Sequence, residues 1–116
     1  MAKKFIIAVD LGGTNLKVAI LGLKYNIIDK NVLSTQEFRK KEDLISAIAY
    51  SVNNIIENNK LKKRDILGAG LGLPGPTDQK SGRVHFFPNI PGFRRVNLKS
   101  ILEKRLRLPI FLDNDA

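Results

Sequence analysis

The sequence contains no cysteine and no tryptophan, and it has a single histidine and a single methionine in 116 residues. Without cysteine the chain forms neither a disulfide framework nor a thiolate metal site. No apolar run approaches the roughly 18 residues that a membrane-spanning helix needs, so no membrane partner is expected. The apolar stretch between Lys4 and Asp10 is also shorter than a signal peptide requires. We therefore expect a cytoplasmic protein.

Acidic residues are also scarce. Lysine and arginine number 20 against 11 aspartate and glutamate residues, which gives a formal net charge of +9. Such an excess suits polyanions, either nucleic acid or a substrate that carries phosphates. The basic residues are spread along the chain, mainly over residues 39–41, 60–64 and 99–107, and aromatic residues make up only 7%. This pattern favours a phosphate-bearing substrate at least as much as nucleic acid.

The first third of the chain predicts an antiparallel meander. Residues 4–11, 16–23 and 27–35 are rich in apolar and β-branched side chains, and short turns separate them. Three consecutive strands joined by tight turns pair in antiparallel fashion.

The remainder predicts helices alternating with strands. Residues 41–59 place apolar side chains at the 3.6-residue helical period, and Asn97 is a good N-cap for a second helix with Leu98, Ile101, Leu102 and Leu106 as its buried stripe, ended by Pro109. Strands are expected at 65–73 and 110–112, and the proline-rich stretch between residues 74 and 95 is expected to be a loop with a small hairpin at 83–87. The expected order is βββαβαβ. The fold class is therefore α/β, with a mixed sheet that begins as an antiparallel meander, continues with parallel strands and carries helices packed on it.

The first turn, "VDLGGTN", offers consecutive backbone N–H groups at Gly12, Gly13 and Thr14. Such a nest binds anionic oxygen, and the Thr14 hydroxyl adds a donor. Asp10 precedes the turn and is suited to Mg²⁺, which prefers a carboxylate together with water and phosphate. The alternative is a plain hairpin turn whose glycines only supply positive φ.

The stretch from Gly70 to Gly75 matches the dinucleotide fingerprint G-x-G-x-x-G by chance. That fingerprint needs a helix that opens at its third glycine, whereas Pro76 and the residues after it predict a loop. Pro76 also occupies the position of the lysine that a P-loop requires. Neither nucleotide motif is therefore assigned here.

The last eight residues, "PIFLDNDA", run from an apolar strand into Asp113, Asn114 and Asp115. A carboxylate at this position suits a general base in phosphoryl transfer, and ligand crevices lie at the carboxyl ends of strands in open α/β sheets. The alternative is an Asx-rich turn that caps a following helix. His85, the lone histidine, is interpreted as a surface or half-packed residue without a chemical role.

Four motifs follow one another along the chain: "AVDLGGTNLKVAI", "GAGLGLPGPTD", "SGRV" with "PNIPGF", and "PIFLDNDA". Together they resemble the N-terminal domain of ROK-family proteins (repressor, open reading frame, kinase), which are glucokinase-like sugar kinases of the actin-like, ribonuclease H-like ATPase superfamily. The resemblance implies a ribonuclease H-like domain and an ATP-dependent hexose kinase that uses Mg²⁺. It also implies a sugar substrate such as glucose or an N-acetylhexosamine.

The resemblance implies roles for particular residues. Asp115 would be the catalytic base that takes the proton from the attacking sugar hydroxyl. The ATP γ-phosphate and Mg²⁺ would be held by the first loop, with Asp10 as the metal ligand. The cofactor-binding residues would be Asp10, Gly12, Gly13 and Thr14, and the substrate-binding residues would be Gly82, Arg83, Asn89 and Asn114.

Members of that family have two lobes of similar topology with the active site between them. Residues 1–116 would be the N-terminal lobe alone, with the C-terminal lobe absent, and the isolated lobe would show no kinase turnover. Its partner-facing surface would be exposed, which predicts a homo-oligomer. The alternative function is the sugar-sensing domain of a ROK transcriptional repressor. Nucleic acid is expected as a partner only in that case, where a helix-turn-helix precedes the first phosphate loop. A non-sugar actin-like ATPase is disfavoured by "PNIPGF" and "LDNDA".

Overall fold

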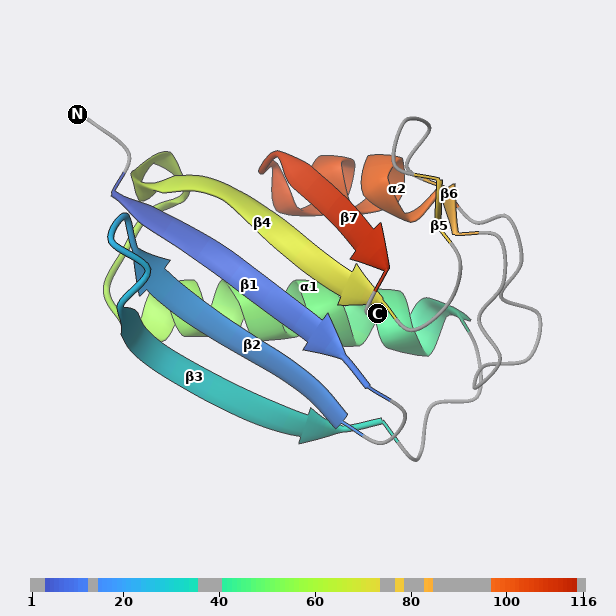
Figure 1. Ribbon diagram of the computed structural model, residues 1–116, viewed down its shortest axis with the longest axis horizontal. Coiled ribbons are helices and arrows are strands. Elements are labelled where there is room, and N and C mark those ends of the chain that lie inside the picture. The colour runs from blue at the N-terminus through green and yellow to red at the C-terminus, as the bar shows by residue number, and fades with distance from the viewer. Residues whose placement is uncertain are drawn as a thin grey trace.

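The computed structural model describes residues 4–12, 15–35, 41–73, 77–78, 83–84 and 97–114. Its main feature is a five-stranded sheet in the order β3-β2-β1-β4-β7. Both α-helices lie on one side of this sheet, behind it in Figure 1. The other side of the sheet faces the viewer.

The antiparallel half of the sheet is the predicted meander. It consists of β1 (Phe5–Leu11), β2 (Asn15–Gly22) and β3 (Ile27–Ser34). The β2–β3 turn closes through a 2.9 Å hydrogen bond from the Tyr25 amide to the Gly22 carbonyl. A Cβ on Gly22 would lie 2.6 Å from Oδ1 of Asn26, so a larger residue there would displace the Asn26 side chain.

The parallel half is built by the crossover segments. β4 (Ile66–Leu73) runs parallel to β1, and β7 (Ile110–Asn114) runs parallel to β4. The register places Asp10 beside Gly72 and Gly72 beside Asp113. The predicted mixed sheet is confirmed, and β1, β4 and β7 end at the same edge.

The core lies between the sheet and the two helices, α1 (Lys41–Asn58) and α2 (Leu98–Leu106). Alternate residues of each inner strand point into it, as the period of two requires. None of the helices in the described part of the chain is long and apolar enough to cross a bilayer. The fully buried large side chains are Ile7, Leu11, Leu16, Ile20, Leu44, Ile48, Ile55, Ile66, Leu71 and Leu98.

The ends of α2 follow from local chemistry. The Asn97 side chain accepts a 3.1 Å hydrogen bond from the Ser100 amide, which confirms the predicted N-cap. The helix ends at Leu106, and Arg107 adopts the left-handed conformation with φ 58°. The predicted buried stripe was wrong at one position, because Ile101 is 37% exposed at the rim of the core.

Two further predictions require correction. The small hairpin pairs β5 (Thr77–Asp78) with β6 (Arg83–Val84), so it begins earlier than the predicted 83–87. The final strand does not stop at Leu112, since β7 includes Asp113 and Asn114. Their backbones continue the ladder beside Gly72 and Leu73, so both residues belong to the strand and not to a turn beyond it.

Candidate functional site

Two hollows open on the face of the sheet that the described helices leave uncovered. The first, about 560 Å³, is floored by Ala8, Gly70 and Gly72 and flanked by Phe111 and by Lys99 of α2. The ammonium of Lys99 lies 6.0 Å from the centre of the Phe111 ring. Small residues on the inner strands therefore leave a shallow depression over β1, β4 and β7.

The second hollow, about 430 Å³, lies over β1, β2 and β3. Asp10, Lys17, Lys30 and Val32 line it together with Ala8 and neighbouring strand residues. Ala8 contributes to both hollows, which therefore adjoin each other along β1.

Asp10 stands next to last in β1, and its side chain is exposed. Its Oδ1 lies 3.6 Å from the position that a Cβ on Gly72 would occupy. Lys17 is the cross-strand partner of Asp10 in β2, so both side chains rise from the same face. A carboxylate and an ammonium are thus placed together where β1 leads into the glycine turn.

Lys17 is a residue that the sequence reasoning missed. The signal was available, because a tight turn between two antiparallel strands fixes the pairing of residues on either side of it. Pairing outward from Gly12 and Asn15 brings Asp10 opposite Lys17.

Gly12 occupies a different role from the one expected. Its amide donates a 2.9 Å hydrogen bond to the Asn15 carbonyl, so this N–H serves the turn itself. The other predicted donors of the nest, Gly13 and Thr14, lie outside the described residues.

The carboxyl end of β7 lies two strands away from Asp10 at the same edge. Because neighbouring strands are about 4.8 Å apart, the β1 and β7 backbones are separated there by about 10 Å. The hairpin carrying Arg83 lies nearby, since β5 contacts β7 and β6 contacts α2. Of the other predicted residues, Asn114 ends β7. Gly82, Asn89 and Asp115 lie outside the described residues.

The donor set suits one mode of metal binding. Within the described ranges no group of three or more His, Cys, Asp or Glu side chains could enclose a metal ion. Mg²⁺ in phosphoryl-transfer sites is usually bound by one or two carboxylates together with water and substrate phosphates. A single exposed carboxylate at Asp10, beside a glycine turn, fits that mode.

The match to known families decides where the chain belongs. Residues 6–116 match the family model described as the ROK family. The chain belongs to the ROK family. The predicted resemblance is thereby confirmed over nearly the whole sequence.

ROK relatives include both enzymes and regulators. The chain is 33% identical to the glucokinase of Halalkalibacterium halodurans and 34% identical to that of Thermotoga maritima. Each of these matches spans all of this chain and 35% of the relative. The xylose repressor of Caldicellulosiruptor bescii is 27% identical over 96% of this chain and 28% of its own length. The chain thus covers about a third of the proteins it resembles.

Solved ROK structures share the fold. The ROK hexokinase from Thermus thermophilus matches with a TM-score of 0.82 at 30% identity, over 97% of this chain and 35% of the other. The ROK glucokinase from Streptomyces griseus, in complex with glucose and AMPPNP, matches with a TM-score of 0.82 at 30% identity. This match covers 97% of this chain and 33% of the other. A ROK transcriptional regulator, a homologue of the E. coli MLC protein, matches with a TM-score of 0.84 at 18% identity and shows the fold alone. The predicted ribonuclease H-like, actin-like class is confirmed.

Proposed function

We propose that this chain is the N-terminal lobe of an ATP-dependent hexose kinase of the ROK family that acts in the cytoplasm. One observation carries the proposal. The parallel register brings Asp10 of β1 and Asp113–Asn114 of β7 to one edge of the sheet, on either side of Gly72. Glucokinases at 33% and 34% identity and a ROK glucokinase that binds glucose and AMPPNP support the same activity.

The nucleotide end of the site would be the β1–β2 turn. Asp10 would hold Mg²⁺, and the Gly13 and Thr14 amides would face the γ-phosphate of ATP. Lys17, opposite Asp10, adds a positive charge where the phosphates accumulate negative charge. Mg²⁺ supplies neutralisation of the β- and γ-phosphate oxygens when it is bound. The lobe contributes mainly positioning and electrostatic stabilisation.

The sugar end of the site would be the edge formed by β7 and the β5–β6 hairpin. Asn114 would hydrogen-bond the sugar hydroxyls, with Gly82, Arg83 and Asn89 as further contacts. Asp115 would accept the proton of the attacking hydroxyl. A base within hydrogen-bond reach of that hydroxyl contributes about 10²–10⁴ to the rate.

The substrate would be a hexose such as glucose or an N-acetylhexosamine. The test is a coupled ADP-release assay on the full reading frame that contains this lobe, with both sugars and with ATP and Mg²⁺. We expect turnover that Asp115→Asn lowers by about 10²–10⁴ without a comparable change in the KM for ATP. Full activity in Asp115→Asn would exclude Asp115 as the base.

The lobe by itself is expected to show no turnover, because the reaction needs the second lobe to close the cleft over the nucleotide. Measurable ADP release from the 116-residue chain with glucose would refute this division of labour. Isothermal titration of the isolated chain with MgATP is expected to give weak binding at most.

The second candidate is the sugar-sensing domain of a ROK repressor. It is favoured by the 27% identity to a xylose repressor over 96% of the chain. In that case the full protein binds the sugar with no ADP release and binds operator DNA through a separate domain. Sugar binding without turnover in the assay above would select this function.

A further inference from the structure

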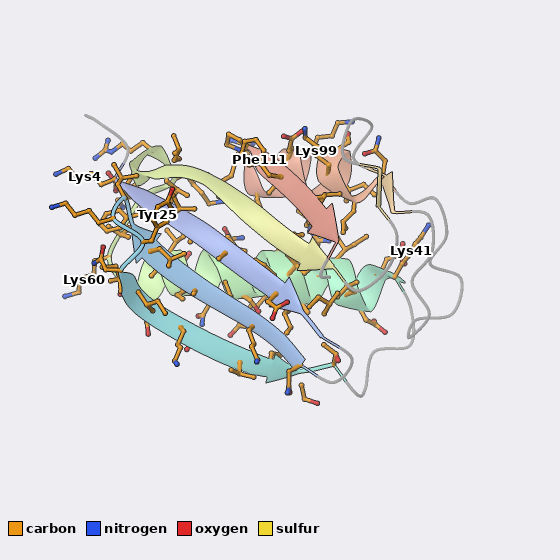
Figure 2. The ribbon with its side chains drawn as sticks, in the orientation of Figure 1. Lys4, Tyr25, Lys41, Lys60, Lys99 and Phe111 are labelled. Carbon is orange, nitrogen blue, oxygen red and sulfur yellow. The ribbon has the colours of Figure 1, made fainter. Side chains whose placement is uncertain are left out.

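The end of the sheet opposite the proposed site gathers the basic residues that are scattered in the sequence. β1, β3 and β4 begin at this end and β2 finishes there, since Phe5 lies beside both Gly22 and Ile66 and Ile27 lies beside Leu21. β7 begins further along the sheet, beside Ala69. Figure 2 shows Lys4, Tyr25 and Lys60 together at this end, far from Lys41. We call this surface the basic end: Lys4, Lys24, Lys60, Lys62, Lys63, Arg64 and Arg107.

Four carboxylates lie near the basic end, those of Asp29, Glu57, Asp65 and Glu103, and three of them accept hydrogen bonds. Asp29 accepts from the Asn59 side chain at 3.0 Å, and Asp65 accepts from the Lys62 amide at 2.9 Å. Glu103, one turn before Arg107, accepts from the Ile110 amide at 3.1 Å. These carboxylates keep their negative charge, but the seven ammonium and guanidinium groups of the basic end outnumber them.

Lys63 and Arg107 lie close together at the end of α2. Its ammonium donates to the Leu106 carbonyl at the end of α2. Partial burial lowers the pKa of Lys63, and the nearby Arg107 guanidinium lowers it further, against the opposing influence of Glu57. Two cations are therefore held close together at this end, which is a favourable place for an anion.

In three turns at the basic end, a residue with a long side chain adopts a backbone conformation that glycine adopts at lower energetic cost. Tyr25, Lys60 and Arg107 adopt left-handed backbone conformations with φ of 64°, 58° and 58°. Such positions favour glycine or asparagine, because a Cβ there meets the backbone. All three positive-φ residues other than glycine in the described part of the chain carry either a cation or an aromatic ring.

Tyr25 supplies a ring among these cations. It is 77% exposed at the tip of the β2–β3 turn, next to Lys24. A planar, solvated aromatic ring beside several cations is the combination that binds single-stranded nucleic acid, in which bases stack on the ring and phosphates meet the cations.

We infer that the basic end is a binding surface for single-stranded nucleic acid, with Tyr25 as the stacking residue and Lys60, Arg107 and the neighbouring lysines as phosphate contacts. In the sequence the basic residues are dispersed, which disfavoured nucleic acid as a partner. In the folded chain residues 4, 24, 60–64 and 107 come together at one end, so that argument no longer applies. The basic end and the proposed kinase site lie at opposite ends of the strands. The inference about nucleic acid therefore does not rest on the proposed function.

The test uses the 116-residue chain and a fluorescein-labelled 20-nucleotide single strand, followed by fluorescence anisotropy. We expect the logarithm of the association constant to fall linearly with the logarithm of salt concentration, with a slope of about −0.7 for each phosphate contacted. The variant Tyr25→Gly/Lys60→Gly/Arg107→Gly should bind at least tenfold more weakly and with a shallower slope. Its melting temperature should be equal or higher, because glycine relieves the left-handed positions.

The matched control is Tyr50→Ala/Lys30→Ala/Lys41→Ala. It removes the same formal charge and one exposed tyrosine from elsewhere on the surface. Retained binding in this control supports a localised surface. An equal loss in both variants would show that the overall charge alone attracts the probe, which overturns the inference.

Single replacements at Tyr25 separate nucleic acid from other anions. Tyr25→Phe should keep the affinity for the oligonucleotide. Tyr25→Leu should lower this affinity several-fold, because leucine keeps apolar area but has no aromatic face. Inorganic polyphosphate or vesicles of anionic phospholipid that bind as tightly as the oligonucleotide, and equally well to Tyr25→Leu, would overturn base stacking. Absence of oligonucleotide binding at 50 mM salt would also overturn the inference.

Discussion

At the scale of single residues, the proposed site depends on which side chains the ladder places opposite one another. Asp10 could be selected from the sequence because it precedes a double-glycine turn. Lys17 could be found only by pairing the two strands outward from the short turn, which places it opposite Asp10. Both lie in the hollow of about 430 Å³ on the uncovered face.

We expect Lys17→Met in the full-length kinase to raise the KM for ATP about tenfold, because a charge-assisted contact to phosphate is worth about 1.5–3 kcal/mol. Lys30→Met is the control, since Lys30 lines the same hollow from β3 but is not the partner of Asp10. Steady-state kinetics at saturating sugar measure both. An unchanged KM in Lys17→Met would remove this residue from the phosphate site.

The glycines of β4 differ in how much space a side chain would have. A Cβ on Gly68 would lie 3.1 Å from the Pro109 carbonyl oxygen and 3.2 Å from the Phe111 ring, whereas a Cβ on Gly70 would meet nothing within 4 Å. Gly68→Ala is therefore expected to lower the free energy of unfolding by about 1–3 kcal/mol, as overpacking does. Gly70→Ala should leave it unchanged or raise it by about 0.5–1 kcal/mol. Urea denaturation of both variants distinguishes them, and equal effects would contradict this account.

At the scale of elements, most of the fold could be predicted from the sequence. Periodicity located the three strands of the meander and α1, because each has a clear apolar pattern, and Asn97 located the start of α2. The strand pairing of Asp113 and Asn114 could not be predicted, because it depends on β4 lying alongside. The small hairpin was also misplaced, since strands of two residues carry no periodic signal.

The candidate site was less predictable than the fold. The sequence pointed to the two strand ends that converge, but the use of the Gly12 amide within its own turn is a matter of turn geometry. The resemblance alone supplied the roles of Gly82 and Asn89, whereas the position of Asp115 after a strand also suggested a base. All three roles stay predictions.

The junction between the short helix η1 (Lys63–Asp65) and α2 predicts a dependence of stability on alkaline pH. The pKa of Lys63 is below its ordinary value of 10.5 in the folded chain, so the unfolded chain binds this proton more tightly. Stability should therefore rise as the pH increases through the window between the lowered pKa and 10.5. Urea midpoints across that window, compared with Lys63→Gln, isolate this contribution. A difference between the two proteins that stays constant with pH would contradict it.

At the scale of the whole molecule, the sheet is covered asymmetrically by the described helices. The core occupies one face, while Phe111, which flanks the first hollow, is 61% exposed on β7. Apolar side chains around a hollow of about 560 Å³ are the kind of patch that associates with another surface.

We expect the 116-residue chain to self-associate through this uncovered face in a concentration-dependent way. Phe111→Ser should shift the chain toward monomer in sedimentation or light scattering. Tyr50→Ser is the control, because Tyr50 is 65% exposed on α1. A strictly monomeric wild-type chain at high concentration would refute this expectation.

The central position of β1 also bears on the order in which the chain folds. β1 pairs with β2 through a short turn, but β2, β3, α1 and η1 lie between β1 and its other neighbour, β4, in the sequence. Local pairings close early and distant ones late, because closing a longer loop costs more conformational entropy. β1 thus pairs early with β2 and gains β4 as its second partner only later. The edge that unites Asp10 with the end of β7 should be the last part of the sheet to form.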